Sequence, residues 1–317
     1  MGKQFSFTLR AELSSIVGDN KIIGTGIGPD GQAVLLMVVP EFEKTPFSRE
    51  GPEGGASFPD SRAKSCYPAI YIRFDGHKEI QRTELAQVEI AFPHVQPLPN
   101  GEILLVGARC YFRDGDPEKN AMVYSREGKL LRQFVLGDGI NDVQTTSDGK
   151  IWVSYFDEGV FGNFGWKEPL GASGLICFDA NGVVEWKFTP PEGFDFICDC
   201  YALNVAKDAV WACYYTDFPL VRIDAIRQVR GWNNNVGGAN ALVTDGKKVL
   251  LWGGYGDKAM RCVVQSMSEN TLAKKYEVTL CLPDGSGLVG TTVFGRDLTL
   301  HAFVADRWFS LDLNQLP

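Results

Sequence analysis

Polar side chains able to do acid–base or metal chemistry occur at the starts of strand-like segments. His94 is one of only three histidines in the 317-residue chain, and Asp142 occupies a similar place in the following segment. An imidazole beside a carboxylate can act as a general base, or the two groups can share a divalent cation. The alternative is a histidine that only binds water within the fold.

Further carboxylates have the chemistry that calcium prefers. Calcium takes several carboxylate and carbonyl oxygens, and solvated loop carboxylates explain the same residues equally well. The candidate oxygen ligands are Asp142, Asp157, Asp195 and Asp199.

A second set of side chains predicts a concave polar binding site. Aligned on their turns, the segments place His94, Asp142, Tyr201, Asn240 and Thr291 at equivalent strand starts. The ends of the next strands carry Arg109, Asp157, Glu158, Tyr215, Asp217, Asp257 and Asp306. Trp166, in GVFGNFGW, alternates with glycines together with Phe161 and Phe164, so these rings are either packed or directed at a ligand.

The elements that carry these residues repeat six times. A turn followed by a strand recurs as PDG-QAVLLMVV, PNG-EILLVGA, SDG-KIWVSYF, AKD-AVWACYY, TDG-KKVLLWGG and GRD-LTLHAFV. The mean spacing is about 53 residues, which is compatible with the blades of a β-propeller. A second series of turns, such as FDGHKEIQ and FDANGVVEWKF, alternates with the first. Each repeat therefore predicts four antiparallel strands joined by tight hairpins.

The last repeat lacks a fourth strand, and the chain begins with an unassigned strand at Gln4–Leu13. Pairing of this strand in the last blade removes an open sheet edge. We therefore predict an all-β, six-bladed β-propeller of four-stranded antiparallel blades, closed by the N-terminal strand, in a single domain of residues 1–317. The expected blades are 19–86, 87–137, 138–190, 196–233, 236–280, and 286–317 with 3–13.

Within each blade, inner strands buried on both faces should be continuously apolar, as in Leu35–Val38 and Ile103–Val106. Trp152, Trp211 and Trp252 recur at matching positions, which indicates packing between blades. The length variation lies in the loops between second and third strands, at Pro40–Cys66, Arg109–Asn120 and Asp157–Ala172. We expect a binding site among these loops.

Composition excludes several partners. The formal charge is −8 and no basic run occurs, so binding to nucleic acid is not expected. Apolar runs are far shorter than the roughly 20 residues that span a bilayer, and the N-terminus lacks a secretory apolar core, so we expect a cytoplasmic protein without a membrane segment. The eight cysteines are scattered without a CxxC pair, which indicates free, buried thiols.

The DGxhWV-type turns resemble those of the broad six-bladed propeller group that includes gluconolactonase-like and NHL-like proteins, over essentially the whole chain. Gluconolactonase-like members hold a divalent metal on Glu, Asn and Asp side chains, and the resemblance implies such parts for Asp142 and Asn240. A matching Glu is missing from blade 1.

Two functions follow as alternatives. The first is a binding scaffold that engages a protein or small-molecule ligand through its loop-rich face, with Arg109, Asp157, Glu158, Trp166, Tyr201, Tyr215 and Asp257 as contacts. The second is a hydrolase, lactonase or lyase assisted by a divalent cation such as calcium. Its catalytic residues would be His94, Asp142 and Asn240, with Asp142, Asn240 and Asp199 as metal ligands.

Overall fold

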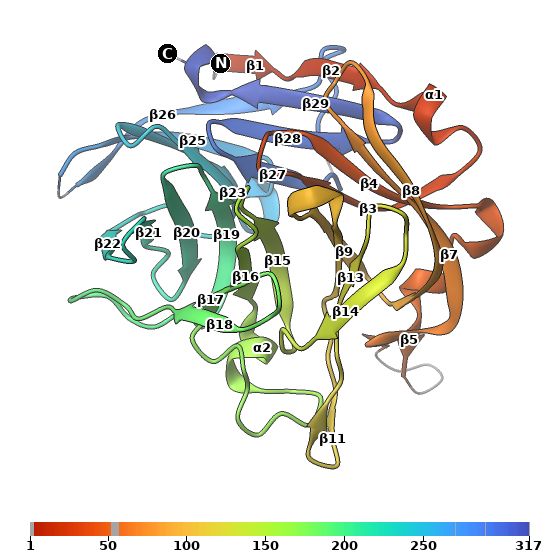
Figure 1. Cartoon of the computed structure of the whole chain (residues 1–317). Helices are drawn as coiled ribbons and strands as arrows, with labels where there is room; N and C mark the ends of the chain where they lie inside the picture. Colours follow the sequence, from red (N-terminus) through yellow and green to blue (C-terminus); the bar gives the residue numbers. More distant parts are fainter. Residues whose placement is uncertain (1–2, 52–56, 270, 289, 317) are drawn as a thin grey trace. The chain divides into compact units, whose positions relative to one another are not determined.

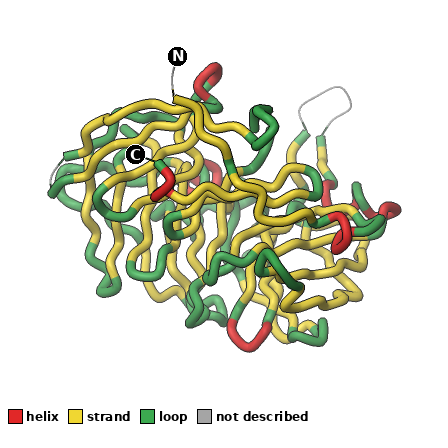
Figure 2. The backbone as a smooth tube through the Cα atoms, turned by 90° about the horizontal axis from the view of Figure 1, so that it is seen from above, coloured by secondary structure: helices red, strands yellow, loops and turns green. Residues whose placement is uncertain are grey.

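Strands dominate the computed structural model, which describes residues 3–51, 57–269, 271–288 and 290–316 (Figures 1 and 2). The helical elements are short. They are α1 (Ser14–Val17), α2 (Asp157–Phe161), η1 (Pro40–Phe42), η2 (Thr45–Phe47), η3 (Pro99–Gly101), η4 (Gly256–Lys258) and, after the last strand, η5 (Leu313–Gln315). The chain divides into two compact units, which we call the middle unit (Ile16–Phe188) and the terminal unit (Met1–Ser15 with Thr189–Pro317).

The middle unit contains three four-stranded antiparallel sheets. Blade 1 is β3 (Lys21–Ile27), β4 (Ala33–Val38), β7 (Arg62–Phe74) and β8 (Glu79–Ile90); blade 2 is β9 (Pro93–Pro97), β10 (Ile103–Gly107), β13 (Ala121–Tyr124) and β14 (Leu130–Phe134); blade 3 is β15 (Ile140–Thr145), β16 (Ile151–Tyr155), β17 (Leu175–Phe178) and β18 (Val184–Lys187). Two small ribbons, β5 (Arg49–Glu50) with β6 (Phe58–Pro59) and β11 (Phe112–Arg113) with β12 (Asp116–Pro117), extend from blades 1 and 2.

The terminal unit contains the other three blades. Blade 4 is β19 (Asp199–Val205), β20 (Ala209–Tyr215), β21 (Leu220–Asp224) and β22 (Val229–Trp232); blade 5 is β23 (Ala239–Thr244), β24 (Lys248–Gly253), β25 (Arg261–Met267), β26 (Leu272–Cys281) and β1 (Lys3–Ser6); blade 6 is β27 (Val293–Arg296), β28 (Thr299–Val304), β29 (Arg307–Asp312) and β2 (Thr8–Glu12). The predicted six-bladed β-propeller is thus confirmed.

The N-terminal segment closes blade 6, as predicted. β2 pairs antiparallel with β29, Thr8 opposite Ser310 and Glu12 opposite Arg307, and the two strands lie side by side in Figure 1. The segment is not one strand, however, because it changes blades at Phe7. Residues before it form β1, which pairs in parallel with β26 and gives blade 5 a fifth strand. The Phe7 amide donates to the Cys281 carbonyl at 2.9 Å, so the crossing point is itself hydrogen-bonded.

The core lies between neighbouring blades. Every residue of β4, β10 and β16 is buried, which confirms the expected continuous apolar strands. Trp152, Trp211 and Trp252 are at most 5% exposed and belong to this packing. All eight cysteines are free thiols, and six of them are buried.

We expect the stability of the folded protein to depend on pH because of His301, which lies on β28. It is buried, and its Nδ1 accepts a hydrogen bond of 3.2 Å from the Trp308 indole. Burial and the nearby Arg10 and Arg296 lower the pKa of His301 to about 3. Since a histidine in the unfolded chain has a pKa of about 6.5, the unfolded state binds a proton first as the pH falls. The free energy of unfolding should drop by about 3 kcal/mol between pH 7 and pH 4 from this residue alone.

Denaturant titrations of the wild type and of His301→Gln at pH 7, 5 and 4 check this expectation. Glutamine keeps an acceptor for the indole but does not titrate in this range. The difference in stability between the two proteins should therefore shrink as the pH falls. A difference that stays constant from pH 7 to pH 4 would show that His301 is protonated equally easily in both states.

Candidate functional site

The predicted site residues lie at one end of each blade, where the first strand begins and the second ends. The pairing shows this directly, because His94 lies opposite Val106, Asp199 opposite Tyr215 and Ala239 opposite Gly253. We call this the loop end of a blade. The connections between second and third strands leave from it. They are long in the middle unit, at residues 39–61, 108–120 and 156–174, and short in the terminal unit. Residues 52–56 of the first insertion lie outside the described residues.

The charge of Asp142 influences His94, the other half of the predicted acid–base pair. His94 is the second residue of β9 in blade 2, and it hydrogen-bonds with the backbone of Ile140 in blade 3. Burial lowers the pKa of His94, while the Asp142 carboxylate and the hydrogen bond oppose this shift. Burial thus favours the neutral form of the imidazole. The predicted catalytic role of His94 and Asp142 stays a prediction.

The Asp142 carboxylate is itself held by two donors. Its Oδ1 accepts from the Val143 amide at 2.8 Å, and its Oδ2 accepts from Gln144 Nε2 at 3.0 Å. Among the residues that the structure describes, no group of three or more His, Cys, Asp or Glu side chains is placed to hold a metal ion. Asp142 lies in the middle unit, whereas Asn240 and Asp199 lie in the terminal unit. Their predicted role as shared calcium ligands stays a prediction.

The strand register corrects the predicted alignment of the repeats. The first strands of blades 3, 4 and 5 each contain a β-bulge one residue before the ladder resumes. The residues that the ladder register skips are Asn141, Tyr201 and Asn240. Tyr201 and Asn240 are therefore equivalent to Asn141, and Asp142 lies one residue further along its strand. A bulge adds a residue without disturbing the apolar pattern, so sequence alignment missed the shift.

Arg109 links the insertion of blade 2, residues 108–120, to the insertion of blade 3, residues 156–174. Only 5% of its side chain is exposed, and its Nε and one terminal nitrogen bond both oxygens of Asp138 at 2.9 and 3.0 Å. The guanidinium also pairs with Glu158 Oε2 at 2.6 Å. Asp138 further accepts from the Cys110 amide at 2.8 Å. Arg109 thus fixes the insertions to each other, and its predicted contact with a ligand stays a prediction.

Small residues permit this close packing. Gly139 follows Asp138 with a φ of +66°, a conformation that favours glycine, and a Cβ there would lie 2.2 Å from the Gly159 amide nitrogen. Gly159 follows Glu158 in α2, so the approach of the two backbones brings Glu158 within reach of Arg109. Asp157 lies beside it, exposed, and accepts the Glu158 amide hydrogen bond at 2.8 Å.

Aromatic rings cover this ion-pair network. Phe164 lies over the Arg109 guanidinium, 3.9 Å from ring centroid to Cζ, and contacts the Tyr111 ring at 4.2 Å. Trp166 donates its indole N–H to the Cys110 carbonyl at 2.7 Å and packs on Phe112 with centroids 5.0 Å apart. The glycine-flanked rings of GVFGNFGW are therefore largely packing, except for Phe161, which is 61% exposed.

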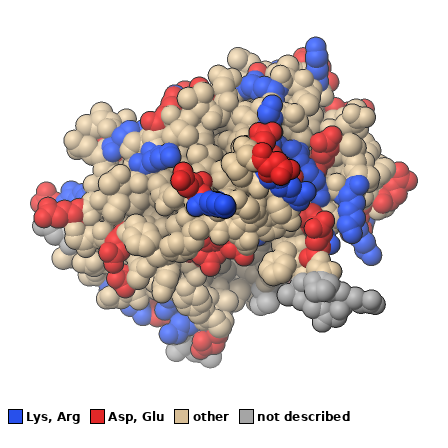
Figure 3. Space-filling model, turned by 90° about the horizontal axis from the view of Figure 1, so that it is seen from below, with Lys and Arg blue, Asp and Glu red and all other residues tan. Residues whose placement is uncertain are grey.

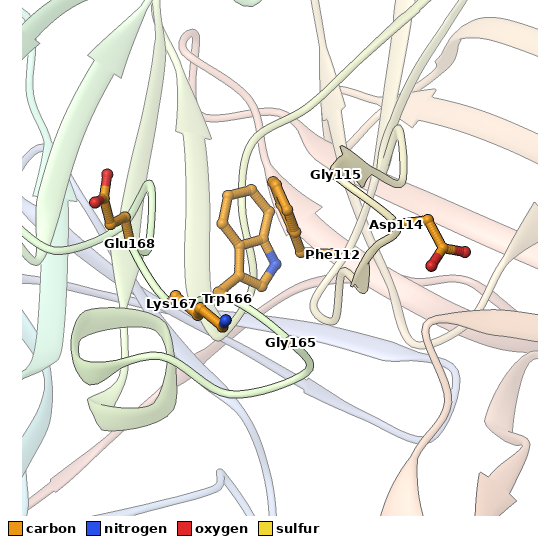
Figure 4. Close-up of a pocket in the computed structure, with 7 residues that line it drawn as sticks. All are labelled: Phe112, Asp114, Gly115, Gly165, Trp166, Lys167 and Glu168. Atoms are coloured by element: carbon orange, nitrogen blue, oxygen red, sulfur yellow. The ribbon is translucent and has the colours of Figure 1, made fainter.

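A cavity of about 520 Å³ opens beside Trp166. Figure 4 shows the Phe112 and Trp166 rings close together, with the β11–β12 turn on one side and the segment of Lys167 and Glu168 on the other. The lining residues are Phe112, Asp114, Gly115, Gly165, Trp166, Lys167 and Glu168. The sequence identified Trp166 but not Phe112 or Asp114, because nothing local shows that the ribbon folds against this insertion.

In the terminal unit, four rings gather at the loop ends of blades 4 and 5. We call Tyr201, Tyr215, Phe218 and Tyr255 the tyrosine cluster. Phe218 lies 5.3 Å from Tyr201, 5.7 Å from Tyr215 and 6.0 Å from Tyr255, measured between ring centroids. The Tyr255 hydroxyl donates to that of Tyr201 at 2.7 Å. The sequence predicted Tyr201 and Tyr215 but missed Phe218 and Tyr255, which lie in short loops without a repeat signal.

Charged side chains of both signs are interspersed on the face shown in Figure 3. That nucleic acid is not a partner stays a prediction. Among the described residues, no helix has the length and apolar character needed to cross a bilayer.

Comparisons with known proteins add the following. The sequence model of the YxzG family matches residues 175–304, less than half of the chain. No curated protein matches the sequence. Similar solved structures include virginiamycin B lyase from Staphylococcus aureus (a catalytically inactive form with quinupristin; 12% identity, 93% of this chain and 95% of that one, TM-score 0.41) and BamB from Moraxella catarrhalis (13%, 92% and 83%, 0.45). The Cps50 (Swd1) β-propeller domain of Myceliophteria thermophila is similar as well (9%, 92% and 96%, 0.46). Identities and TM-scores this low carry no inference about what the chain binds.

Proposed function

We propose that this β-propeller is a binding scaffold whose insertions at the loop end hold a small-molecule ligand. The observation that carries this proposal is the cavity beside Phe112 and Trp166. Its volume of about 520 Å³ lies in the range of small-molecule sites, roughly 300–1,000 Å³. Engagement of a protein partner through the same loops is the broader form of this function, and it stays a prediction.

The chemistry of the lining defines the ligand class. Phe112 and Trp166 offer ring surface for a planar apolar group, and Lys167, Glu168 and Asp114 supply charges of both signs. A planar aromatic molecule with a charged substituent matches this combination. The buried Arg109–Asp138 pair beneath the loops supports the cavity wall in advance, which reduces the ordering cost of binding.

Ligand-observed NMR with indole-3-acetate and tryptamine tests the proposal. We expect at least one probe to bind the wild type and Trp166→Ala to weaken that binding at least tenfold. Trp166→Phe, which keeps a ring but loses the hydrogen bond to the Cys110 carbonyl, should give an intermediate affinity.

Phe161→Ala is the matched control, since Phe161 lies on the same insertion but does not line the cavity. Its binding should equal that of the wild type. Thermal unfolding of each variant separates lost binding from lost folding. The proposal fails if neither probe binds the wild type at millimolar concentration, or if Phe161→Ala and Trp166→Ala behave alike.

A further inference from the structure

The tyrosine cluster presents ring surface to solvent. Tyr215 is 46% exposed and Tyr255 is 55% exposed, although both rings contact Phe218. The rings of Tyr201, Phe218 and Tyr255 meet at steep angles of 72° to 83°, so they form a compact body with outward faces. Aromatic surface of this kind on a loop end is a candidate contact for a ligand.

Close packing and a hydrogen bond hold the tyrosine cluster in one arrangement. Phe218 and Tyr255 rest on the backbone of Gly237 and Gly238, where an added Cβ would lie 3.2 Å and 3.0 Å from the two rings. Phe218 has a φ of +54° and Asp217 a φ of +64°, a region that non-glycine residues seldom occupy. Strained backbone that the surrounding packing holds in place is concentrated at functional sites. The hydrogen bond between Tyr255 and Tyr201 fixes the two hydroxyl groups.

Carboxylates neighbour the rings in the sequence. Asp217 precedes Phe218, Asp257 follows Tyr255 by two residues, and both are exposed. Neither takes part in an ion pair among the described residues. Asp199 adds a third carboxylate directly across the strand pair from Tyr215. The cations near the rings in the sequence are Lys207, Arg222, Lys258 and Arg261. Arg222 lies over the Trp211 ring, with its Cζ 5.9 Å from the centroid, and Arg261 donates to the Gly237 carbonyl at 3.2 Å.

We propose that the tyrosine cluster binds an organic cation, an ammonium or guanidinium group. The faces of aromatic rings are electronegative and attract cations, and carboxylates beside them strengthen that attraction. The exposed carboxylates of Asp217 and Asp257, which neighbour Phe218 and Tyr255 in the sequence, disfavour an anion, and a neutral apolar ligand would gain nothing from them. The charge of the chain, −8, also favours the approach of a cation.

Two sources share this chemistry, a free amine and the lysine or arginine side chain of another protein. Titrations by NMR with choline and with a blocked tetrapeptide that contains one lysine and one arginine distinguish them. Tighter binding of the peptide by tenfold or more assigns the site to a protein side chain, and equal or weaker binding assigns it to a free amine. In either case 3,3-dimethyl-1-butanol, the neutral analogue of choline, should bind at least fivefold more weakly than choline.

Substitutions in and around the tyrosine cluster test which residues bind the cation. Tyr255→Leu keeps an apolar side chain but removes the ring face, and it should weaken choline binding at least fivefold. Asp217→Asn with Asp257→Asn should weaken it to a similar degree and reduce its dependence on salt. Phe161→Leu, an exposed ring of the middle unit, and Trp166→Ala should leave it unchanged, so this site and the cavity of the proposed function are tested independently. The inference is overturned if the neutral analogue binds as well as choline, or if Tyr255→Leu binds choline like the wild type.

Discussion

Arg109→Met should lower the free energy of unfolding by about 3–5 kcal/mol. The guanidinium and the Asp138 carboxylate are 5% and 1% exposed, and they share two hydrogen bonds. Methionine fills most of the volume but leaves Asp138 buried without its partner. Burial already raises the pKa of Asp138, and the arginine opposes that rise. Without Arg109 the carboxyl group must either stay charged in an apolar setting or take up a proton.

Guanidinium chloride titrations with two companion variants show whether the buried charge is the cause. Arg109→Met combined with Asp138→Leu removes both charges and should recover much of the loss. Glu158→Gln should cost about 1 kcal/mol or less, because Glu158 is 31% exposed. A double variant that is no more stable than Arg109→Met alone would assign the effect to packing instead.

Phe7→Ala should cost about 3–5 kcal/mol, a large effect for a residue so near the chain end. The ring is 1% exposed and belongs to the core shared by blades 5 and 6, with Leu280 and Phe309 among its members. It lies where the N-terminal segment passes from β26 to β29. Its removal leaves a cavity between the two blades and loosens the strands on both sides.

Leu9→Ala is the matched control for this prediction, since Leu9 is on β2 but 40% exposed. Its cost should stay below about 1 kcal/mol. Denaturant titration of both variants gives the comparison. Equal losses would mean that strand pairing, rather than the buried Phe7 ring, holds the N-terminal segment.

Several features of the chain could be predicted from local sequence. Turns such as those at Gly31 and Gly149 place glycine where φ is positive, at +72° and +90°, and they mark the hairpins. Continuous apolar runs marked the buried strands β4 and β10. Both signals depend only on neighbours in the chain. Counting them gave six blades, and the strand missing at the end pointed to closure by the N-terminus.

Other features came from contacts between segments distant in the chain. The partner of Arg109 is Asp138, 29 residues away, and the tyrosine cluster joins Tyr201 to Tyr255, 54 residues away. The parallel pairing of β1 with β26 spans some 275 residues. No turn or period encodes which loop packs on which, because that choice follows from how the side chains of adjacent blades fit together. The sequence by itself therefore determined the repeated blade and its loop end. Tertiary packing alone decided which residues meet at that loop end.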